Sequence, residues 1–583
     1  MFEGNLDGLS PQAGVTSFAA GVLLHVFLFR LGEWDLATLK LITIFVLSFY
    51  AIILAFLSNL HPMIPHAGTL GSAVWLTTTL SGCHLAGLYT SMAIYRGFFH
   101  RLHRFPGPIL ARFSGVYMTV RGLKSMQMFK DIQKLHSIYG EVVRVGPQEL
   151  SVTRPDAIQA LHSSSSPVNK GPFYDMTAPF LSLQTIRSKS AHAPVRKVWD
   201  RAFSAKSLRD YEPRVSKYTE MLLKQLEARV GTPVNMTSWI SFYGFDVMGD
   251  LAFGRSFDML STGEVNYHIS LMQEFLKIRA MFSRVPWAFR IMQVTMLLNT
   301  SFNKFRSWME EQVKTRMKNE PDKPDVFSWI LSDYQARQNK TQQDFFNLMG
   351  ECTLITIAGR QVKINSCTWF KQLISTSDTT SSTLTCLLFE LARQPDIFKR
   401  LQGEIDQCFK DYGDDIPGHF ELSKLEYLQA CIDEALRLYP PLPSGVQRMT
   451  PPEGLQIDDD LHIPGDTIVQ VPLYTMYRDE RLFKCPDRFI PERWTTRREL
   501  VTEAACFTPF LIGGFSCVGK QLALMEIRYV ISQLARLYDV SLAKGQTPEA
   551  FTDGNYDTFT IRLAPLNMIL HHRADSKSER SKA

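Results

Sequence analysis

Between Pro509 and Lys520 the chain reads PFLIGGFSCVGK, and no other stretch says more about its architecture. It places Cys517 on a glycine-rich loop, directly ahead of a helical pattern from Gln521 to Leu537. A thiolate there would face the backbone N–H groups at a helix start, which stabilise negative charge. Such a cysteine is suited to be the axial ligand of a haem iron. The alternative is a buried free cysteine near a helix start, which is the commoner role of a single cysteine.

The composition sets the limits of the interpretation. With 583 residues the chain can hold one large domain plus extra segments, and 45% hydrophobic and 21% charged residues are ordinary for a globular protein. The net charge of +6 is spread without a long basic run, so we expect no nucleic-acid partner. The nine cysteines form no CxxC pair, which argues against a disulfide scaffold or a zinc site and indicates a reducing compartment.

The first hundred residues differ from the rest. Leu41 to Leu60 is a stretch of twenty residues without a charge, long enough to cross a membrane. Gly14 to Phe29 and Thr69 to Tyr95 are further apolar segments, so we expect an anchor of up to three transmembrane helices in residues 1–100. A cleaved signal peptide is not expected, since positions 1–13 carry acidic and no basic residues. The alternative is a buried helical hairpin of a soluble protein.

A basic cluster and a proline-rich connector follow the anchor. Arg96, Arg101 and Arg104 come directly after the third segment, and the positive-inside rule then places everything after residue 100 in the cytosol. Pro106-Gly107-Pro108 interrupts any helix and marks a hinge. We therefore divide the chain into an anchor, 1–100, and a domain, 101–583.

The domain is predicted to be mainly α with small β-sheets. Glu141 to Thr153 alternates apolar and polar residues around a Gly-Pro turn, as a hairpin does, and strand-like pieces recur at Leu461 to Val471 and Thr558 to Leu570. Helical patterns run through Val215–Leu226, Ser238–Phe253, Asn303–Lys318, Ser381–Arg393 and Tyr427–Leu438. The polar tail, 575–583, is expected to be disordered.

A second motif supports the cysteine loop. Glu434 and Arg437 lie three residues apart on one helix face, and the run FIPERW containing Arg493 follows some fifty residues later. Taken alone, a Glu-x-x-Arg pair is usually a surface ion pair. Together with the Cys517 loop, and in this order, these motifs resemble the cytochrome P450 family of haem-thiolate monooxygenases over about residues 101–572.

The resemblance implies specific roles for residues of this chain. It implies the cytochrome P450 fold, haem b bound through Cys517, and a triad of Glu434, Arg437 and Arg493 that holds the cysteine loop. Further cofactor-binding positions implied by the resemblance are Phe510, Gly513, Gly519, His192, Arg196 and Arg448. Taken singly, a residue such as His192, Arg196 or Arg448 is more often a solvated base than a ligand. Contacts of these three residues to the haem propionates are suggested only because they occur in the family's order together with the other motifs.

One departure concerns the position two residues before the cysteine. The family commonly has an arginine or histidine there that touches a propionate, whereas this chain has Phe515, which cannot pair with a carboxylate. We therefore expect His192, Arg196 and Arg448 to carry that charge.

A second departure interrupts the oxygen-activating helix. The family pattern reads Ala/Gly-Gly-x-Asp/Glu-Thr-Thr/Ser, and this chain has Ser377-Asp378-Thr379-Thr380 preceded by Ser375-Thr376, while Ala358-Gly359 lies upstream. Removing the 17 intervening residues, 360–376, restores ITIAGSDTTSSTLTCLLFELAR, an uninterrupted motif on an uninterrupted helix. Our hypothesis is a retained intron or gene-model error, because motif and helical pattern agree only after excision. The alternatives are a genuine loop insertion and a shifted helix that uses Ser375-Thr376.

The resemblance assigns the catalytic roles to Asp378 and Thr379. A hydroxyl next to bound dioxygen, with a carboxylate relay to water, supplies the protons that O–O cleavage needs. By family analogy the substrate cavity is lined by the segment from Phe173 to Leu183, the helix before Asp378, Leu442 to Val446, and Asn555 to Thr560. These segments favour an apolar substrate, although the same residues are also typical of a plain core.

The function expected from the resemblance is hydroxylation or epoxidation of an apolar small molecule by a monooxygenase similar to fungal, membrane-bound members of secondary-metabolite pathways. Electrons are expected from NADPH through a separate cytochrome P450 reductase at the endoplasmic reticulum membrane, because no GxGxxG unit opens a strand–helix pair. Two alternatives remain open. One is a haem-thiolate isomerase that rearranges a peroxide, and the other is an inactive haem-binding pseudoenzyme with an interrupted helix.

Overall fold

The computed structural model describes residues 11–58, 67, 69–267, 271, 278–294, 296–321, 323–357, 379–410, 412 and 415–573. The chain forms two compact units, and each is described by itself: Met1–Thr119, Arg144–Glu149 and Phe282–Leu297 make the smaller one, and the rest makes the larger. The predictions for Asp378, for the segment 360–376 and for the tail 575–583 lie outside the described residues.

The smaller unit is built from helices. Its elements are α1 (Pro11–Leu24), η2 (His25–Phe29), η3 (Asp35–Ala37), α2 (Thr38–Leu57), α3 (Leu70–Ile94), η4 (Tyr95–Phe99), α4 (Ile109–Phe113) and α13 (Pro286–Val294). The elements that cross the division between the units are α5 (Val116–Ser125), β1 (Val142–Gly146), and the starts of β2 (Glu149–Val152) and α14 (Met296–Lys318). In the part of the chain that the structure describes, two segments are long and apolar enough to cross a membrane, Pro11–Phe29 with a mean hydropathy of 1.6 and Asp35–Leu57 with 2.4. By length and hydropathy, the first and second of the three predicted spans could cross a membrane. The third, which corresponds to α3, does not meet this criterion.

Helix α3 packs closely along α1 through small residues. A Cβ at Gly21 would lie 2.0 Å from the His84 carbonyl oxygen, and one at Gly87 would lie 2.0 Å from that of Phe18. The Ser17 hydroxyl donates to the Leu80 carbonyl at 2.8 Å. Such contacts are typical of helix pairs in membranes, where close approach replaces the hydrophobic effect as the source of stability. Gly87 is one of the small residues that lower the mean hydropathy of α3, and it is also the residue that allows α3 to approach α1 closely.

The larger unit holds most of the helices and nearly all strands. Its helices are α6 (Met128–Tyr139), α7 (Asp156–His162), α8 (Lys189–Ala202), α9 (Ala205–Glu227), α10 (Met236–Phe253), α11 (Met259–Thr262), α14 (Met296–Lys318), α15 (Val326–Ala336), α16 (Gln342–Ile357), α17 (Thr379–Arg393), α18 (Pro395–Lys410), α19 (His419–Leu422), α20 (Glu426–Leu438), α21 (Leu473–Met476), α22 (Lys520–Leu537) and α23 (Pro548–Asp553). Its strands are β2 (Glu149–Val152), β3 (Asn169–Lys170), β4 (Pro233–Asn235), β5 (Arg448–Met449), β6 (Leu455–Gln456), β7 (His462–Ile463), β8 (Ile468–Gln470), β9 (Tyr538–Leu542), β10 (Tyr556–Thr558), β11 (Thr560–Arg562) and β12 (Asn567–His572). Short helical turns are η5 (Pro172–Thr177), η6 (Pro491–Trp494), η7 (Arg498–Leu500), η8 (Ala504–Cys506) and η9 (Gly513–Phe515).

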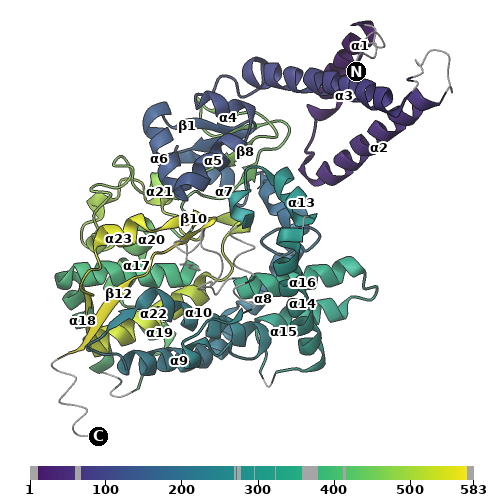
Figure 1. Ribbon diagram of the computed structural model, residues 1–583. Coiled ribbons are helices and arrows are strands. Elements are labelled where there is room, and N and C mark those ends of the chain that lie inside the picture. Colours follow the sequence, from purple (N-terminus) through teal and green to yellow (C-terminus); the bar gives the residue numbers. More distant parts are fainter. Residues whose placement is uncertain are drawn as a thin grey trace. The chain divides into compact units, whose positions relative to one another are not determined.

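Three helices form the centre of the larger unit. Helices α10, α17 and α22 are buried on nearly all sides, and α17 packs against both of the others (Figure 1). A helix buried all round must satisfy its polar side chains internally. Helix α17 does so, because Thr383 donates to the Thr379 carbonyl and Thr385 to the Ser381 carbonyl, both at 2.8 Å. The prediction of a mainly α fold with small sheets is confirmed.

The sheets are small and join distant segments. Strands β2, β8, β5 and β3 are neighbours in that order, and β4-β12-β9, β10-β11 and β6-β7 form the others. The piece predicted at Leu461–Val471 is divided into β7 and β8, because Pro464-Gly465-Asp466 turns the chain and Asp466 has a positive φ of 46°. The short pairing of β3 with β5, which sets Lys170 opposite Arg448, was not predicted.

Candidate active site

The cysteine loop has the strained backbone of a shaped turn. Leu511 and Gly513 have positive φ values of 57° and 69°, and the Cys517 N–H donates to the Phe510 carbonyl at 2.8 Å. A Cβ at Gly513 would lie 2.2 Å from the His162 carbonyl oxygen. Only glycine fits there, since both the backbone angle and the close approach exclude a side chain. The loop therefore presents the exposed Cys517 in one defined position at the start of α22.

Cys517 lines a cavity of about 340 Å³. The lining includes residues from all four segments that the sequence predicted around the substrate: Phe173, Tyr174, Leu183, Leu354, Leu442, Val446, Thr558, Phe559 and Thr560. Phe173 and Phe559 stack with ring centroids 5.0 Å apart, which gives the cavity a broad aromatic wall. A mostly apolar cavity with a few polar groups is the usual form of a small-molecule site.

Phe515 gathers basic side chains around its ring. His192 meets the ring edge-on at 4.8 Å, and the cations of Lys170, Arg448 and Lys189 lie 4.8, 5.0 and 6.0 Å from its centroid. Aromatic faces attract cations, so Phe515 collects positive charge where the family commonly supplies a base itself. We call Phe515 with these four residues the Phe515 cluster.

Strand pairing holds two basic side chains of the Phe515 cluster together. Lys170 in β3 lies directly opposite Arg448 in β5, an arrangement of like charges that is normally destabilising. Burial, followed by the charge of Arg448, lowers the pKa of Lys170 to about 6. The carboxyl group that acts on Lys170 is Glu351, and burial raises its pKa to about 8, so it keeps its proton at neutral pH. Among the described residues, no ionised carboxylate therefore balances the charge of Arg448 or stabilises the protonated form of Lys170.

The basic groups that line the cavity fit the carboxylates of a haem. Arg448 is buried and its Nε has no hydrogen-bond partner among the described residues. Burial, followed by Lys170, Arg196 and Arg448, lowers the pKa of His192 to about 3. A cavity that combines a cysteine thiol, a buried guanidinium and two further buried basic side chains matches a porphyrin that bears iron and two carboxylates.

Arg196 has a second task in the same region. Its Nη1 donates to the Ser516 carbonyl at 2.6 Å, and its Nε pairs with Asp200 at 2.7 Å. The bond to Ser516 fixes the peptide directly before Cys517. Arg196 therefore positions the cysteine loop in addition to lining the cavity.

The structure brings Glu434, Arg437 and Arg493 together in the interior. Glu434 Oε1 accepts from Arg437 Nη2 and Arg493 Nε, both at 2.9 Å, and all three side chains are fully buried. Glu434 also accepts from the Ile490 N–H at 2.9 Å and from Trp494 Nε1 at 3.0 Å. The network is satisfied on every side, which is the condition under which buried charges are tolerated.

The triad reaches the cysteine loop through aromatic residues. Trp494, bonded to Glu434, packs on Phe507 with centroids 4.4 Å apart. Tyr477, whose carbonyl accepts from Arg437, receives the Thr508 N–H on its hydroxyl at 2.9 Å. Phe507 and Thr508 directly precede the loop, so the triad fixes the point from which the loop departs.

The remaining predicted residues have different outcomes. Phe510 and Thr379 both line the cavity, the latter as the first residue of α17. Gly519 has an ordinary φ of −82°, and a Cβ there would lie 3.8 Å from the Phe203 ring, so neither feature requires glycine. Asp378 lies outside the described residues.

Sequence reasoning missed three basic residues of the cavity: Lys170, Arg279 and Arg562. Lys170 stands at the start of the run KGPFYDM, but its role depends on the strand pairing with Arg448, which two-residue strands do not reveal. Arg279 also lines the cavity, and it belongs to a segment with no recognisable motif.

Comparison with known proteins assigns the family. The Cytochrome P450 family model matches residues 106–567. The chain is 47% identical over 560 residues to the cytochrome P450 monooxygenase FCK2 of Fusarium pseudograminearum, covering 95% of this chain and 97% of the relative. It is 34% identical over 563 residues to the tryprostatin B 6-hydroxylase of Neosartorya fischeri, covering 96% and 98%. A cytochrome P450DA heme domain of known crystal structure, 16% identical, shares the fold with a TM-score of 0.65, over 79% of this chain and 96% of that one.

The chain belongs to the cytochrome P450 family and has its fold, preceded by two apolar amino-terminal helices. It is a haem-dependent monooxygenase, as the relatives are, and the family implies a haem-thiolate cofactor, a redox partner and a small-molecule substrate. The isomerase and pseudoenzyme readings find no support among these relatives.

Proposed function

We propose that the protein carries haem b on the Cys517 thiolate and inserts one oxygen atom into an apolar small molecule of fungal secondary metabolism. The observation that supports this most strongly is that Cys517 and the Phe515 cluster share one cavity with an apolar, aromatic wall. Bound there, haem would supply the O–O cleavage chemistry that thiolate ligation favours.

The chain's own residues would then do three kinds of work. Lys170, His192, Arg196 and Arg448 would hold the propionates. Aromatic and aliphatic side chains would exclude water and orient the substrate. Thr379, whose position on the cavity supports the role, would pass protons inward from Asp378.

We further propose that the protein is anchored in the endoplasmic reticulum membrane with its catalytic domain in the cytosol. The apolar helices α1 and α2 support the anchor, and the basic residues at 96, 101 and 104 support the orientation. An NADPH-cytochrome P450 reductase on the same face would supply the electrons, because the sequence carries no flavin or nicotinamide motif of its own.

The experiment that tests this function uses membranes that contain the chain and a fungal reductase. They are incubated with NADPH, isotopically labelled dioxygen and a panel of apolar polycyclic compounds, among them tryprostatin B. We expect NADPH-dependent formation of a product that carries one labelled oxygen atom. Products without label, or the same products without NADPH, would contradict a monooxygenase.

A further inference from the structure

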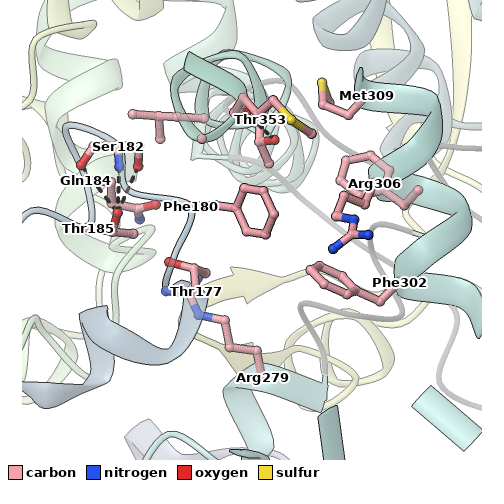
Figure 2. A pocket seen from close by; sticks show the side chains of 14 residues that line it. Thr177, Phe180, Ser182, Gln184, Thr185, Arg279, Phe302, Arg306, Met309 and Thr353 are labelled. Atoms are coloured by element: carbon pink, nitrogen blue, oxygen red, sulfur yellow. Dashed lines mark hydrogen bonds between the residues drawn. The ribbon is translucent and has the colours of Figure 1, made fainter. Parts of the chain in front are cut away.

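A second pocket adjoins the main cavity. It measures about 70 Å³ and is shown in Figure 2, between the segment from Thr177 to Thr185 and the helices α14 and α16. Three residues line both spaces: Gln184, Arg279 and Leu354. A ligand that fills the main cavity can therefore extend to these residues, and Arg279 marks the place where the two spaces meet.

Arg279 is a buried cation without a conventional partner. Its residue exposure is 5%, and its Nε has no hydrogen-bond partner among the described residues. Its guanidinium lies 4.5 Å from the centroid of Phe173. Burial lowers the pKa of Arg279 to about 10, so the side chain is still charged at neutral pH. A ring face offsets only part of the cost of burying a charge, and an uncompensated buried charge is expensive.

No carboxylate balances Arg279 from the walls. Among the described residues that line the two spaces there is no carboxylate, and the basic side chains are Lys170, His192, Arg196, Arg279, Arg306, Arg448 and Arg562. Four of these lie with the proposed propionate site, Arg562 donates to the Thr558 hydroxyl at 2.8 Å, and Arg306 is exposed on α14. Arg279 alone combines full burial with a position on both spaces.

We propose that Arg279 binds an anionic group of the substrate, a carboxylate or a phosphate, and so selects apolar molecules that carry one acidic end. The planar guanidinium can donate two parallel bonds to either anion, and Gln184 beside it offers an amide. Phe173, Phe559 and Leu354 would receive the apolar body. This inference rests on the proposed function, because it concerns the substrate of the same cavity.

Binding of matched probes to the holoenzyme tests the proposal. The probes are dodecanoate, dodecyl phosphate and dodecanol, which share one apolar chain, and binding is followed by the haem absorption change and by calorimetry. We expect at least one acid to bind about tenfold or more tightly than the alcohol. Arg279→Met should remove this preference with little effect on the alcohol, and Arg279→Lys should keep part of it. Arg209→Met, at an exposed arginine of α9, should change nothing.

Three results would overturn the inference. They are equal binding of acids and alcohol by the unchanged protein, an acid preference that survives Arg279→Met, and loss of haem from Arg279→Met, which would make Arg279 a haem contact. Calorimetry reports probe binding whether or not the Cys517 thiolate ligates iron. The chain could lack the thiolate-type spectrum and still bind acids more tightly than the alcohol in a way that depends on Arg279. That result would contradict the proposed function and leave the inference about Arg279 standing. Whichever acid binds more tightly identifies the anion.

Discussion

At the residue scale, Glu434 is the buried carboxylate that both Arg437 and Arg493 contact. Replacing it by glutamine removes the carboxylate that these two residues share, and leaves two buried guanidinium groups without that compensation. We expect Glu434→Gln to lower the free energy of unfolding by about 3–5 kcal/mol, the usual cost of breaking a buried pair. Denaturation followed by tryptophan fluorescence measures this loss.

The matched control is Glu426→Gln, which alters an exposed carboxylate on the same helix, α20. Its effect should stay within about 0.5 kcal/mol. Equal stability of the two variants would show that the buried triad has no structural role.

We expect the binding of haem to depend on pH through the amino group of Lys170. The protein alone holds the pKa of Lys170 at about 6, and propionate carboxylates beside it would raise that pKa. Haem binding would then take up a proton, so the affinity should be greatest below about pH 6 and fall as the pH rises above it. We expect haem to dissociate faster at pH 8 than at pH 6, measured by transfer to an excess of apomyoglobin.

Substitutions of Lys170 distinguish this pH dependence of haem binding from a general destabilisation of the fold. Lys170→Met should release haem faster at pH 6 and lose most of the pH dependence. Lys170→Arg, which keeps its charge at both pH values, should release haem slowly at pH 6 and at pH 8. An unchanged pH dependence in Lys170→Met would contradict the assignment.

At the element scale, helices α16 and α17 flank the interrupted motif. Helix α16 ends at Ile357, α17 begins at Thr379, and both pack against α10. We propose that these are the two halves of one helix, which the segment 360–376 separates. Deleting that segment should raise the yield of haem-containing protein, and it should raise the thermal midpoint of unfolding by several degrees. The reason is that one continuous helix replaces two helix ends whose backbone groups lack intrahelical partners.

The control for this deletion is removal of residues 575–583, the polar tail. That change should affect neither haem content nor the thermal midpoint. If the full-length chain incorporates haem as well as the shortened one, and transcripts retain the 51 nucleotides that encode the 17 residues, the segment is a genuine insertion.

The contrast between α22 and β3 explains which elements could be predicted from the sequence. Helix α22, like α10 and α20, carries a long apolar pattern, and such patterns define helices to within a few residues. Strands β3 and β5 contain two residues each, and no periodicity exists over that length. They form because the tertiary fold sets them side by side. The pairing of Lys170 with Arg448 could therefore not be predicted from the sequence, although Arg448 itself is among the predicted propionate contacts.

In the candidate site, the residues that stand in motifs could be predicted from the sequence, whereas the contacts made by packing could not. Cys517, Glu434, Arg437 and Arg493 stand in motifs with characteristic spacing, and the structure gives them the expected neighbours. Phe515 was noted as unable to pair with a carboxylate, yet its ring collects cations from three other segments, which only three-dimensional packing reveals.

At the scale of the whole molecule, we propose that the amino-terminal helices hold the enzyme in a membrane. A chain that begins at Arg101 lacks both α1 and α2, the two helices among the described residues that are long and apolar enough to cross a membrane. We expect the full chain to stay in the membrane pellet after an alkaline carbonate wash, and the shortened chain to move into the supernatant. Retention of the shortened chain after the wash would mean that another part of the protein holds it to the membrane.

The central claim is that Cys517 ligates haem iron through its thiolate. The most direct test is the reduced, carbon-monoxide-bound absorption spectrum of membranes that carry the chain with and without residues 360–376, each also as Cys517→Ser. The account predicts a strongly red-shifted Soret band in the shortened chain that has Cys517, and its loss on Cys517→Ser. A band that survives Cys517→Ser, or its absence from both chains that have Cys517, would contradict the account.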